Sequence, residues 1–374
     1  MDLTNAAVFF LIKFIACFIA FNAVLMVVAY TVLAERKVLG WIQGRIGPNR
    51  VGPWGMLQPF ADLFKFIFKE DIVPDKSTRF VYFLAPIIAL ICALLPMVVY
   101  PFGPNVNLTS LGLQDIPYAG HYLSSFPLAI ARFDVSLLFV LAITSVGVYG
   151  IALAGWSSNN KYSLMGGLRA SAQMISYELA MGMSVIGVVI LAGSLDVFTI
   201  AEKQTINWGQ YIPVIGQYIP GWYIIPQFFG FVIFLIAAFA ETNRVPFDLP
   251  EAETELVAGF HTEYSALKFA LFFMAEYVNM FTVSAMCTTL FLGGWHVPGL
   301  SYLFAYGSIP YAIISVMAFF AKIFGFLFFY IWVRGSLPRF RFDQLMNFGW
   351  KFLLPAAILN VILTITIVLF LPAR

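Results

Sequence analysis

The stretch AAVFFLIKFIACFIAFNAVLMVVAYTVLA, from Ala6 to Ala34, decides the class of fold. A transmembrane helix needs about 20 apolar residues, and this stretch is longer than the roughly 7–15 residues of a signal-peptide core. Apolar segments of similar character recur to the end of the chain. The expected spans are Phe9–Leu33, Phe80–Tyr100, Val135–Leu153, Ala172–Leu191, Pro226–Ala240, Phe269–Leu292, Ile309–Val333 and Phe352–Leu371. The sequence therefore predicts an all-α integral membrane protein with about eight transmembrane helices.

Composition agrees with a membrane protein and excludes several classes of function. Only 11% of the 374 residues are charged, whereas soluble domains contain about 25%. A net charge of +2 is too small to indicate a nucleic-acid partner. The three cysteines lie in apolar segments without a CxxC pair, and the three histidines lack metal-ligand spacing. We therefore expect no disulfide, no iron–sulfur cluster and no metal in this chain.

The loops predict the orientation of the chain. Of the 21 Lys and Arg residues, 16 fall on the side that holds loops 35–79, 154–171, 241–268 and 334–351, and only three fall in loops on the other side. Basic loops stay in the cytoplasm. We expect a single polytopic membrane domain over residues 1–374, with these four loops cytoplasmic and both termini outside.

The first cytoplasmic loop contains a second kind of element. Over residues 56–68, apolar side chains share one helical face and charged ones share the other. The apolar set is Leu57, Phe60, Ala61, Phe64 and Phe68, and the charged set is Asp62, Lys65 and Lys69. This pattern predicts an amphipathic helix in the membrane interface, and it fits a soluble cap packed on the bundle as well. The Gly- and Pro-rich stretch before it predicts a structured loop that presents Arg45 and Arg50.

Ionisable residues inside the spans are expected to have a specific role, because inserting each of them into the membrane costs about 2.5–3.5 kcal/mol. Glu178, Glu276 and Lys322 lie within spans, and Asp134 opens the third span. Two interpretations stay open. Either Glu178 or Glu276 pairs with Lys322 and merely holds helices together, or the carboxylates form a proton path.

The densest polar segment is AETNRVPFDLPEAETEL, from Ala240 to Leu256. Up to Glu263 it contains one base, Arg244, and six acids: Glu241, Asp248, Glu251, Glu253, Glu255 and Glu263. Some of them have possible roles that are only structural, such as a capping box of Asp248 with Glu251, an Arg244–Asp248 pair or a solvated acidic face. Their crowding favours instead a coupling element whose carboxylates titrate as one group.

Four blocks of sequence resemble a known family. They are AERKVLGWIQGRIGPNRVGPWG (34–55) with LQPFAD (57–62), AGWSSNNKYS (154–163) with RASAQMISYE (169–178), the acidic segment through FMAEY (273–277), and WVRGSLPRFRFDQLM (332–346). In order along the chain, they resemble the H-type membrane subunit of bacterial proton-translocating NADH–quinone oxidoreductase, respiratory complex I, whose mitochondrial counterpart is subunit 1. The outer loops 102–131 and 194–223 match weakly.

The resemblance implies a multi-pass subunit of the bacterial inner membrane, placed between a peripheral electron-transfer arm and antiporter-like membrane subunits. It implies quinone as substrate, no cofactor bound by this chain, and iron–sulfur clusters and FMN in partner subunits. By position, it assigns quinone binding to Arg36, Trp41, Arg45, Asp62, Lys65 and Phe247. It assigns the proton pathway to Asp134, Glu178, Glu241, Glu251, Glu253, Glu255, Glu263 and Glu276.

Three other functions are compatible with the same residues. The chain could anchor a related hydrogenase or a ferredoxin- or F420H2-linked complex, act alone as an ion transporter, or serve only in assembly. The similarity in the acidic segment favours the NADH–quinone version of the family.

Overall fold

The structure is a computed structural model that describes residues 3–106, 126–206, 220–248 and 257–370. Within these residues, seven helical segments are long and apolar enough to cross a membrane, and one further apolar helix is shorter. The long helices are α1 (Leu3–Ile42), α3 (Arg79–Leu94), which η2 continues to Val98, α5 (Ser136–Ser157), α6 (Lys161–Ala192), α10 (Ala266–Phe291), α12 (Ile309–Ser336) and α14 (Leu354–Phe370), which ends the helical segment Phe342–Phe370. The shorter one is α8 (Phe228–Glu241). The predicted all-α membrane fold is confirmed.

Short elements connect the long helices. The helical ones are η1 (Pro53–Gly55), α2 (Gln58–Phe68), η2 (Leu95–Val98), α7 (Val197–Lys203), η6 (Gly259–His261), α11 (Leu300–Leu303), α13 (Phe342–Phe348) and the π-turn η7 (Gly349–Leu353), which continues into α14. Two short strands, β1 (Asn105–Val106) and β2 (Phe126–Pro127), pair antiparallel with Asn105 opposite Pro127.

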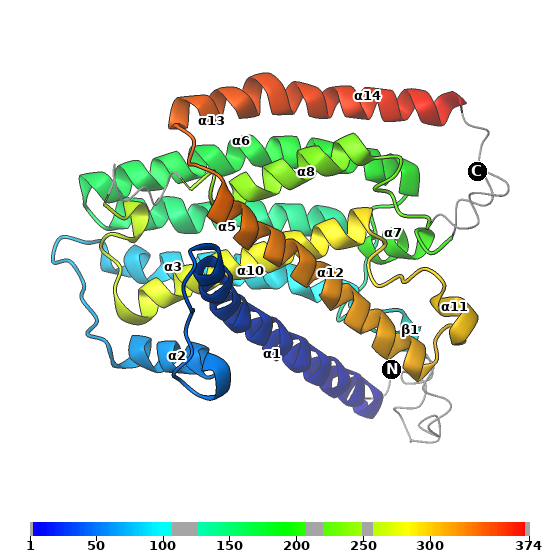
Figure 1. The fold of residues 1–374 in the computed structure, drawn as a ribbon, viewed down its shortest axis with the longest axis horizontal. Coiled ribbons are helices and arrows are strands. Elements are labelled where there is room, and N and C mark those ends of the chain that lie inside the picture. The colour runs from blue at the N-terminus through cyan, green and yellow to red at the C-terminus, as the bar shows by residue number, and fades with distance from the viewer. Residues whose placement is uncertain (1–2, 107–125, 207–219, 249–256, 371–374) are drawn as a thin grey trace.

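Helix α10 is the most buried of the long helices. Helices α5, α6, α8 and α14 lie alongside one another, whereas α1 and α12 cross the bundle diagonally (Figure 1). Helix α10 contacts α3, α12 and α1. Helix α1 is the least buried span and presents most of its surface outward, as expected for a helix that faces lipid or a partner.

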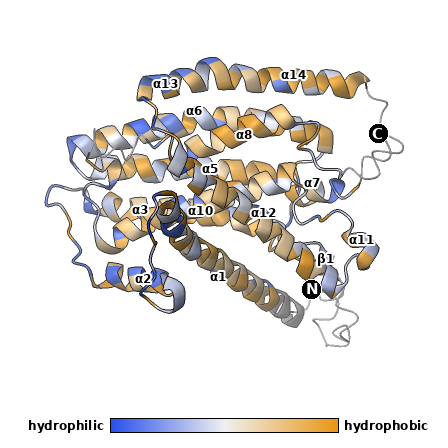
Figure 2. Ribbon diagram, in the orientation of Figure 1, coloured by the Kyte–Doolittle hydropathy of each residue, from blue (hydrophilic) through white to orange (hydrophobic). Residues whose placement is uncertain are grey.

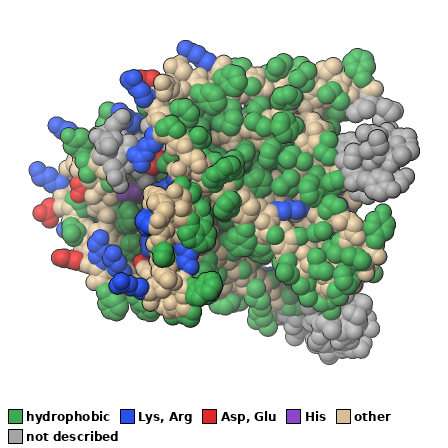
Figure 3. Space-filling view, in the orientation of Figure 1, with side chains coloured by type: hydrophobic (Ala, Val, Ile, Leu, Met, Phe, Trp, Pro, Cys, Tyr) green, Lys and Arg blue, Asp and Glu red, His purple; other side chains and the backbone are tan. Residues whose placement is uncertain are grey.

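Polar and apolar residues separate along the bundle. Hydrophobic residues cover the middle of the helices (Figure 2), and most charged side chains on the visible face gather at one end (Figure 3). Helices α1 and α12 finish at this end, and α6 begins there; we call it the charged end (Figure 1). The first residues of α1 and the last of α14 lie toward the opposite end, which agrees with an even number of crossings.

Small residues let the central helices approach closely. A Cβ atom added to Gly150 of α5 would lie 2.9 Å from Ala89 of α3. One added to Gly167 of α6 would lie 3.1 Å from the Cα atom of Gly155 in α5. Helices in lipid associate through such backbone contacts because no hydrophobic effect drives them together. Helices α3, α5 and α6 therefore form a tightly packed core.

Two helices extend further than their apolar segments predict. Helix α1 continues to Ile42, so Glu35, Arg36 and Trp41 are helical rather than part of a loop. Helix α6 begins at Lys161 and reduces the predicted loop 154–171 to a turn. Hydropathy detects only the part of a helix that lipid surrounds, about 30 Å, whereas the 32 residues of α6 extend about 48 Å. The predicted amphipathic helix exists as α2, and its place in the interface stays a prediction.

Candidate functional site

A buried cluster of charges lies where α1, α10 and α12 meet. Its centre is Glu35 of α1, which is 4% exposed. The Tyr277 hydroxyl of α10 donates a hydrogen bond to Glu35 Oε2 at 2.5 Å. Glu35 Oε1 pairs with Arg334 of α12 and, at 3.3 Å, with Arg244 of the segment after α8. We call Glu35, Arg244, Glu276, Tyr277 and Arg334 the Glu35 cluster.

Arg244 connects this cluster to a second carboxylate. Its Nε atom lies 2.6 Å from Glu276 Oε1, and its guanidinium stacks over the Tyr277 ring, 4.2 Å from the centroid. Burial alone would lower the pKa of Arg244, but Glu276, Tyr277 and Glu35 together hold that pKa well above its usual value. Arg244 is therefore a permanent positive charge inside the protein, held between two acids.

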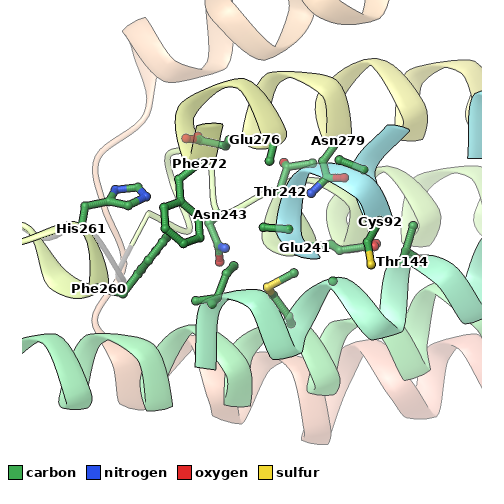
Figure 4. A pocket seen from close by; sticks show the side chains of 16 residues that line it. Cys92, Thr144, Glu241, Thr242, Asn243, Phe260, His261, Phe272, Glu276 and Asn279 are labelled. Carbon is green, nitrogen blue, oxygen red and sulfur yellow. The ribbon is translucent and has the colours of Figure 1, made fainter. Parts of the chain in front are cut away.

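Glu276 also borders a cavity inside the bundle that polar and apolar side chains line together (Figure 4). The volume of the cavity is about 40 Å³. One water needs roughly 10–15 Å³, so the cavity has room for about three waters and none for a quinone. Its lining residues come from α3, α5, α6, α8, α10, η6 and the turn after α8. The polar ones are Thr144, Glu241, Thr242, Asn243, His261, Glu276 and Asn279.

Two further carboxylates belong with Glu276: Glu241, which lines the same cavity, and Glu178, which neighbours Glu241. Glu241 is the last residue of α8 and is 7% exposed; Figure 4 shows it beside Cys92 and Thr144, at the opposite end from His261. It lies close enough to Glu178 of α6 for the two to interact electrostatically. Glu178 in turn accepts a hydrogen bond from Ser145 of α5. Glu276, Glu241 and Glu178 thus form a series from the Glu35 cluster into the core.

The structure does not bring every predicted acid to this series. Asp134 is exposed in the turn before α5, eleven residues ahead of Ser145, which is about 16 Å along a helix. Glu263 accepts a hydrogen bond from Asn160 Nδ2 at 2.6 Å and borders a surface pocket instead. Glu251, Glu253 and Glu255 lie outside the described residues.

Two pairings considered from sequence alone are wrong, whereas the capping box of Asp248 with Glu251 lies outside the described residues. Lys322 donates to the carbonyl oxygens of Leu292, Gly294 and His296, at 2.7–2.9 Å. It therefore covers the carbonyl end of α10 rather than pairing with Glu178 or Glu276. Asp248 pairs with Arg339, at 3.0 Å, rather than with Arg244. Only the folded arrangement of helices decides these partners.

Most of the predicted quinone residues gather around α1 and α2. Arg36 Nη1 lies 2.6 Å from Asp62 Oδ2 and so joins the two helices. Trp41 and Lys65 are exposed, and Arg45 Nε donates to Gln43 Oε1 at 2.8 Å. Trp41 also lines a surface pocket with Ile46 and Trp54. These residues form an amphiphilic surface at the charged end.

Phe247 lies elsewhere. Its ring contacts those of Tyr177 and Phe340, with centroids 5.7 Å and 5.6 Å away. It lines an apolar groove bordered by α8, α12 and α13. The groove residues are Leu235, Ile236, Phe239, Pro246, Phe247, Phe329, Val333, Leu337, Phe340, Gln344, Leu345 and Phe348. We call it the α8–α12 groove.

Sequence reasoning missed Glu35, Tyr277 and Arg334 as site residues. Glu35 directly follows the first apolar segment, where hydropathy predicts that a loop begins. A signal was present, because Tyr277 follows Glu276 and Glu35 precedes Arg36 inside the quoted blocks. In the parts of the chain that the structure describes, no three His, Cys, Asp or Glu side chains come together as metal ligands.

Comparison with known proteins decides the family. A model of the family described as NADH dehydrogenase matches residues 15–365. The chain is 50% identical to an H-type subunit of the NADH-quinone oxidoreductase of Koribacter versatilis, over 96% of this chain and 98% of that protein. The chain belongs to this family of H-type NADH-quinone oxidoreductase subunits.

Two other relatives agree. Subunit 8 of the NADH-quinone oxidoreductase of Rhodothermus marinus is 49% identical, over 92% of this chain and 94% of that protein. An H-type subunit of the same enzyme from Geobacter sulfurreducens is 46% identical, over 92% of each. The resemblance found in the sequence is confirmed, and the similarity extends over nearly all of the chain.

Proposed function

We propose that this chain, as a member of the H-type family, forms the quinone-entry path and the first acidic part of the proton-coupling path of an NADH–quinone oxidoreductase. One observation carries the proposal. Glu276 belongs to the Glu35 cluster and also lines the small cavity that Glu241 lines. A change of charge at the cluster can therefore reach a proton-holding series inside the membrane.

The surface of α1 and α2 supports the quinone path. A quinone has an apolar tail and a polar head, so it needs an apolar slot and a few polar groups. Helix α2 has no buried residue and exposes Phe60, Phe64 and Phe68. The Arg36–Asp62 pair, Trp41, Arg45 and Lys65 supply the polar and aromatic groups beside it. Phe247 lies apart from this surface, in the α8–α12 groove, and we leave it out of the path.

The acidic series supports the coupling path. Quinone reduction consumes two protons and changes the charge near the cluster. Carboxylates that share an environment respond together, because each ionised group opposes ionisation of its neighbour. Waters in the cavity would link Glu276 to Glu241, and Glu178 would carry the series further. Glu251, Glu253, Glu255 and Glu263 would extend it in the acidic segment, whereas the exposed place of Asp134 speaks against a direct part.

The same proposal assigns roles to the partner subunits and an orientation to the chain. Electrons would come from iron–sulfur clusters and FMN in peripheral-arm partners, and protons would pass onward to antiporter-like membrane subunits. The charged end would face the bacterial cytoplasm, in agreement with its basic loops. The chain would have no activity alone.

Glu178→Gln tests the coupling role. Gln keeps the shape and accepts the hydrogen bond from Ser145, but it cannot ionise. In inverted vesicles that contain the assembled enzyme, we expect proton pumping per NADH oxidised to fall strongly. Ser145→Ala is the matched control, because it removes the hydrogen bond and leaves the carboxyl. Full pumping by Glu178→Gln would refute the coupling path proposed here.

A further inference from the structure

The α8–α12 groove has the size and lining of a ligand site. Its volume is about 580 Å³, within the roughly 300–1,000 Å³ of ligand pockets. Helix α8 contributes Phe239, α12 contributes Val333, and α13 contributes Phe348. Gln344 supplies the only polar side chain among the lining residues. The groove therefore suits a hydrocarbon chain.

The charged groups lie beside the groove rather than within it. Phe340 lines it, and Arg339 and Arg341 flank Phe340 in the segment between α12 and α13. Arg339 pairs with Asp248 through Nη2 and is still 41% exposed. A guanidinium has five N–H donors, so Arg339 has donors left for another acceptor. Arg341 is exposed.

This arrangement does not fit a quinone. A quinone requires its polar groups at the far end of an apolar slot, and here they lie at the surface. An acyl chain needs apolar contacts along its length and a polar group at the surface, which the groove and the two exposed arginines provide.

We propose that the α8–α12 groove binds one acyl chain of an anionic phospholipid, whose phosphate is held by Arg339 and Arg341. Two observations support this occupant. The segment that contains Arg339 and Arg341 joins the end of α12 to α13 at the charged end (Figure 1), where lipid head groups of that leaflet would lie. Arg binds phosphate through paired N–H donors, and both guanidiniums are exposed enough to reach one.

A photoactivatable lipid tests the proposal on the assembled complex. The complex is reconstituted with phosphatidylglycerol that bears a diazirine on one acyl chain, or with phosphatidylcholine that bears the same group. After illumination, labelled peptides are mapped by mass spectrometry. We expect phosphatidylglycerol to label residues 235–247 and 329–348 far more than phosphatidylcholine does.

Three variants sharpen the test. Arg341→Gln should lower phosphatidylglycerol labelling of the groove about tenfold, the value of one charge-assisted hydrogen bond. Lys351→Gln, which removes an exposed base from the next turn, should leave the labelling unchanged. Val333→Phe, which fills the groove, should lower labelling there by both lipids.

Three outcomes would overturn the proposal. Equal labelling by the two lipids would reduce the groove to ordinary contact with bulk lipid. Unchanged labelling in Arg341→Gln would remove the head-group site. Cross-linking of a photoreactive residue at Phe340 to another subunit, with no lipid adduct, would show that a protein segment fills the groove.

Discussion

At the residue scale, Glu35 brings together charged and polar side chains from three parts of the chain. Its carboxylate is buried and faces Arg244, Arg334 and the Tyr277 hydroxyl, which come from three different parts of the chain. Desolvating two ions often costs as much as their attraction returns, so a buried pair is weak evidence for stability. Such a cluster is better explained by a need for charges in a fixed place beside Glu276.

Glu35→Gln leaves two guanidiniums facing a neutral amide. Loss of one partner from a buried pair costs about 3–5 kcal/mol. We expect a lower unfolding temperature of the purified complex and a lower rate of NADH–quinone reduction. Thermal unfolding and steady-state activity measure the two effects separately. An unfolding temperature and a rate equal to those of the wild type would contradict this account.

Tyr277→Phe is the milder comparison for the same cluster. It removes one hydrogen bond to a charged group, worth about 1.5–3 kcal/mol, and it retains the ring over which Arg244 stacks. The same two measurements should therefore show a smaller loss than Glu35→Gln. If Tyr277→Phe were the more damaging change, the hydroxyl would have a role beyond holding Glu35.

At the scale of elements, the sequence predicted which segments are helices better than where they end. Apolar segments predicted the spans and the amphipathic pattern predicted α2, because both depend on local periodicity. The end of α1 was missed, since a helix continues past the lipid into polar residues. The partners of Arg244 and Lys322 were missed because they come from distant segments. The close contacts of Gly150 and Gly167 were likewise invisible without the packed helices.

Gly166 fixes the position of η6 against α6. A Cβ atom added there would lie 2.7 Å from the Cα atom of Gly259, whose neighbours Phe260 and His261 line the cavity. Gly166→Ala should force η6 outward and cost about 1–3 kcal/mol. Gly182→Ala in the same helix meets nothing within 4 Å and should be neutral or slightly stabilising. Thermal unfolding of the two variants makes the comparison, and equal midpoints would argue against this packing.

The Arg36–Asp62 pair joins α1 to α2 at the surface. Exposed pairs contribute about 0–1 kcal/mol, so Asp62→Asn should leave thermal stability nearly unchanged. If α1 and α2 guide quinone, the variant should instead raise the KM for quinone with little change in kcat. Asp75→Asn, another exposed acid, is the control for loss of one negative charge. Identical KM values in the two variants would remove α2 from the quinone path.

At the scale of the whole molecule, charge separation indicates the orientation. The charged end contains the turn before Lys161, whereas α11 lies toward the opposite end (Figure 1). Membranes retain basic loops in the cytoplasm, so the two ends should differ in access from outside the cell. The natural cysteines do not obscure such a test, because Cys92 and Cys287 are buried and Cys17 is partly buried within α1.

Lys161→Cys and Tyr302→Cys place one thiol at each end. Lys161 is an exposed first residue of α6, and Tyr302 in α11 is 86% exposed. In intact spheroplasts, a membrane-impermeant maleimide should label Tyr302→Cys at once. It should label Lys161→Cys only after the membrane is permeabilised, which also shows that partner subunits do not cover that thiol. Labelling of Lys161→Cys in intact spheroplasts would reverse the orientation, place the Glu35 cluster near the outer surface, and separate it from a cytoplasmic source of electrons.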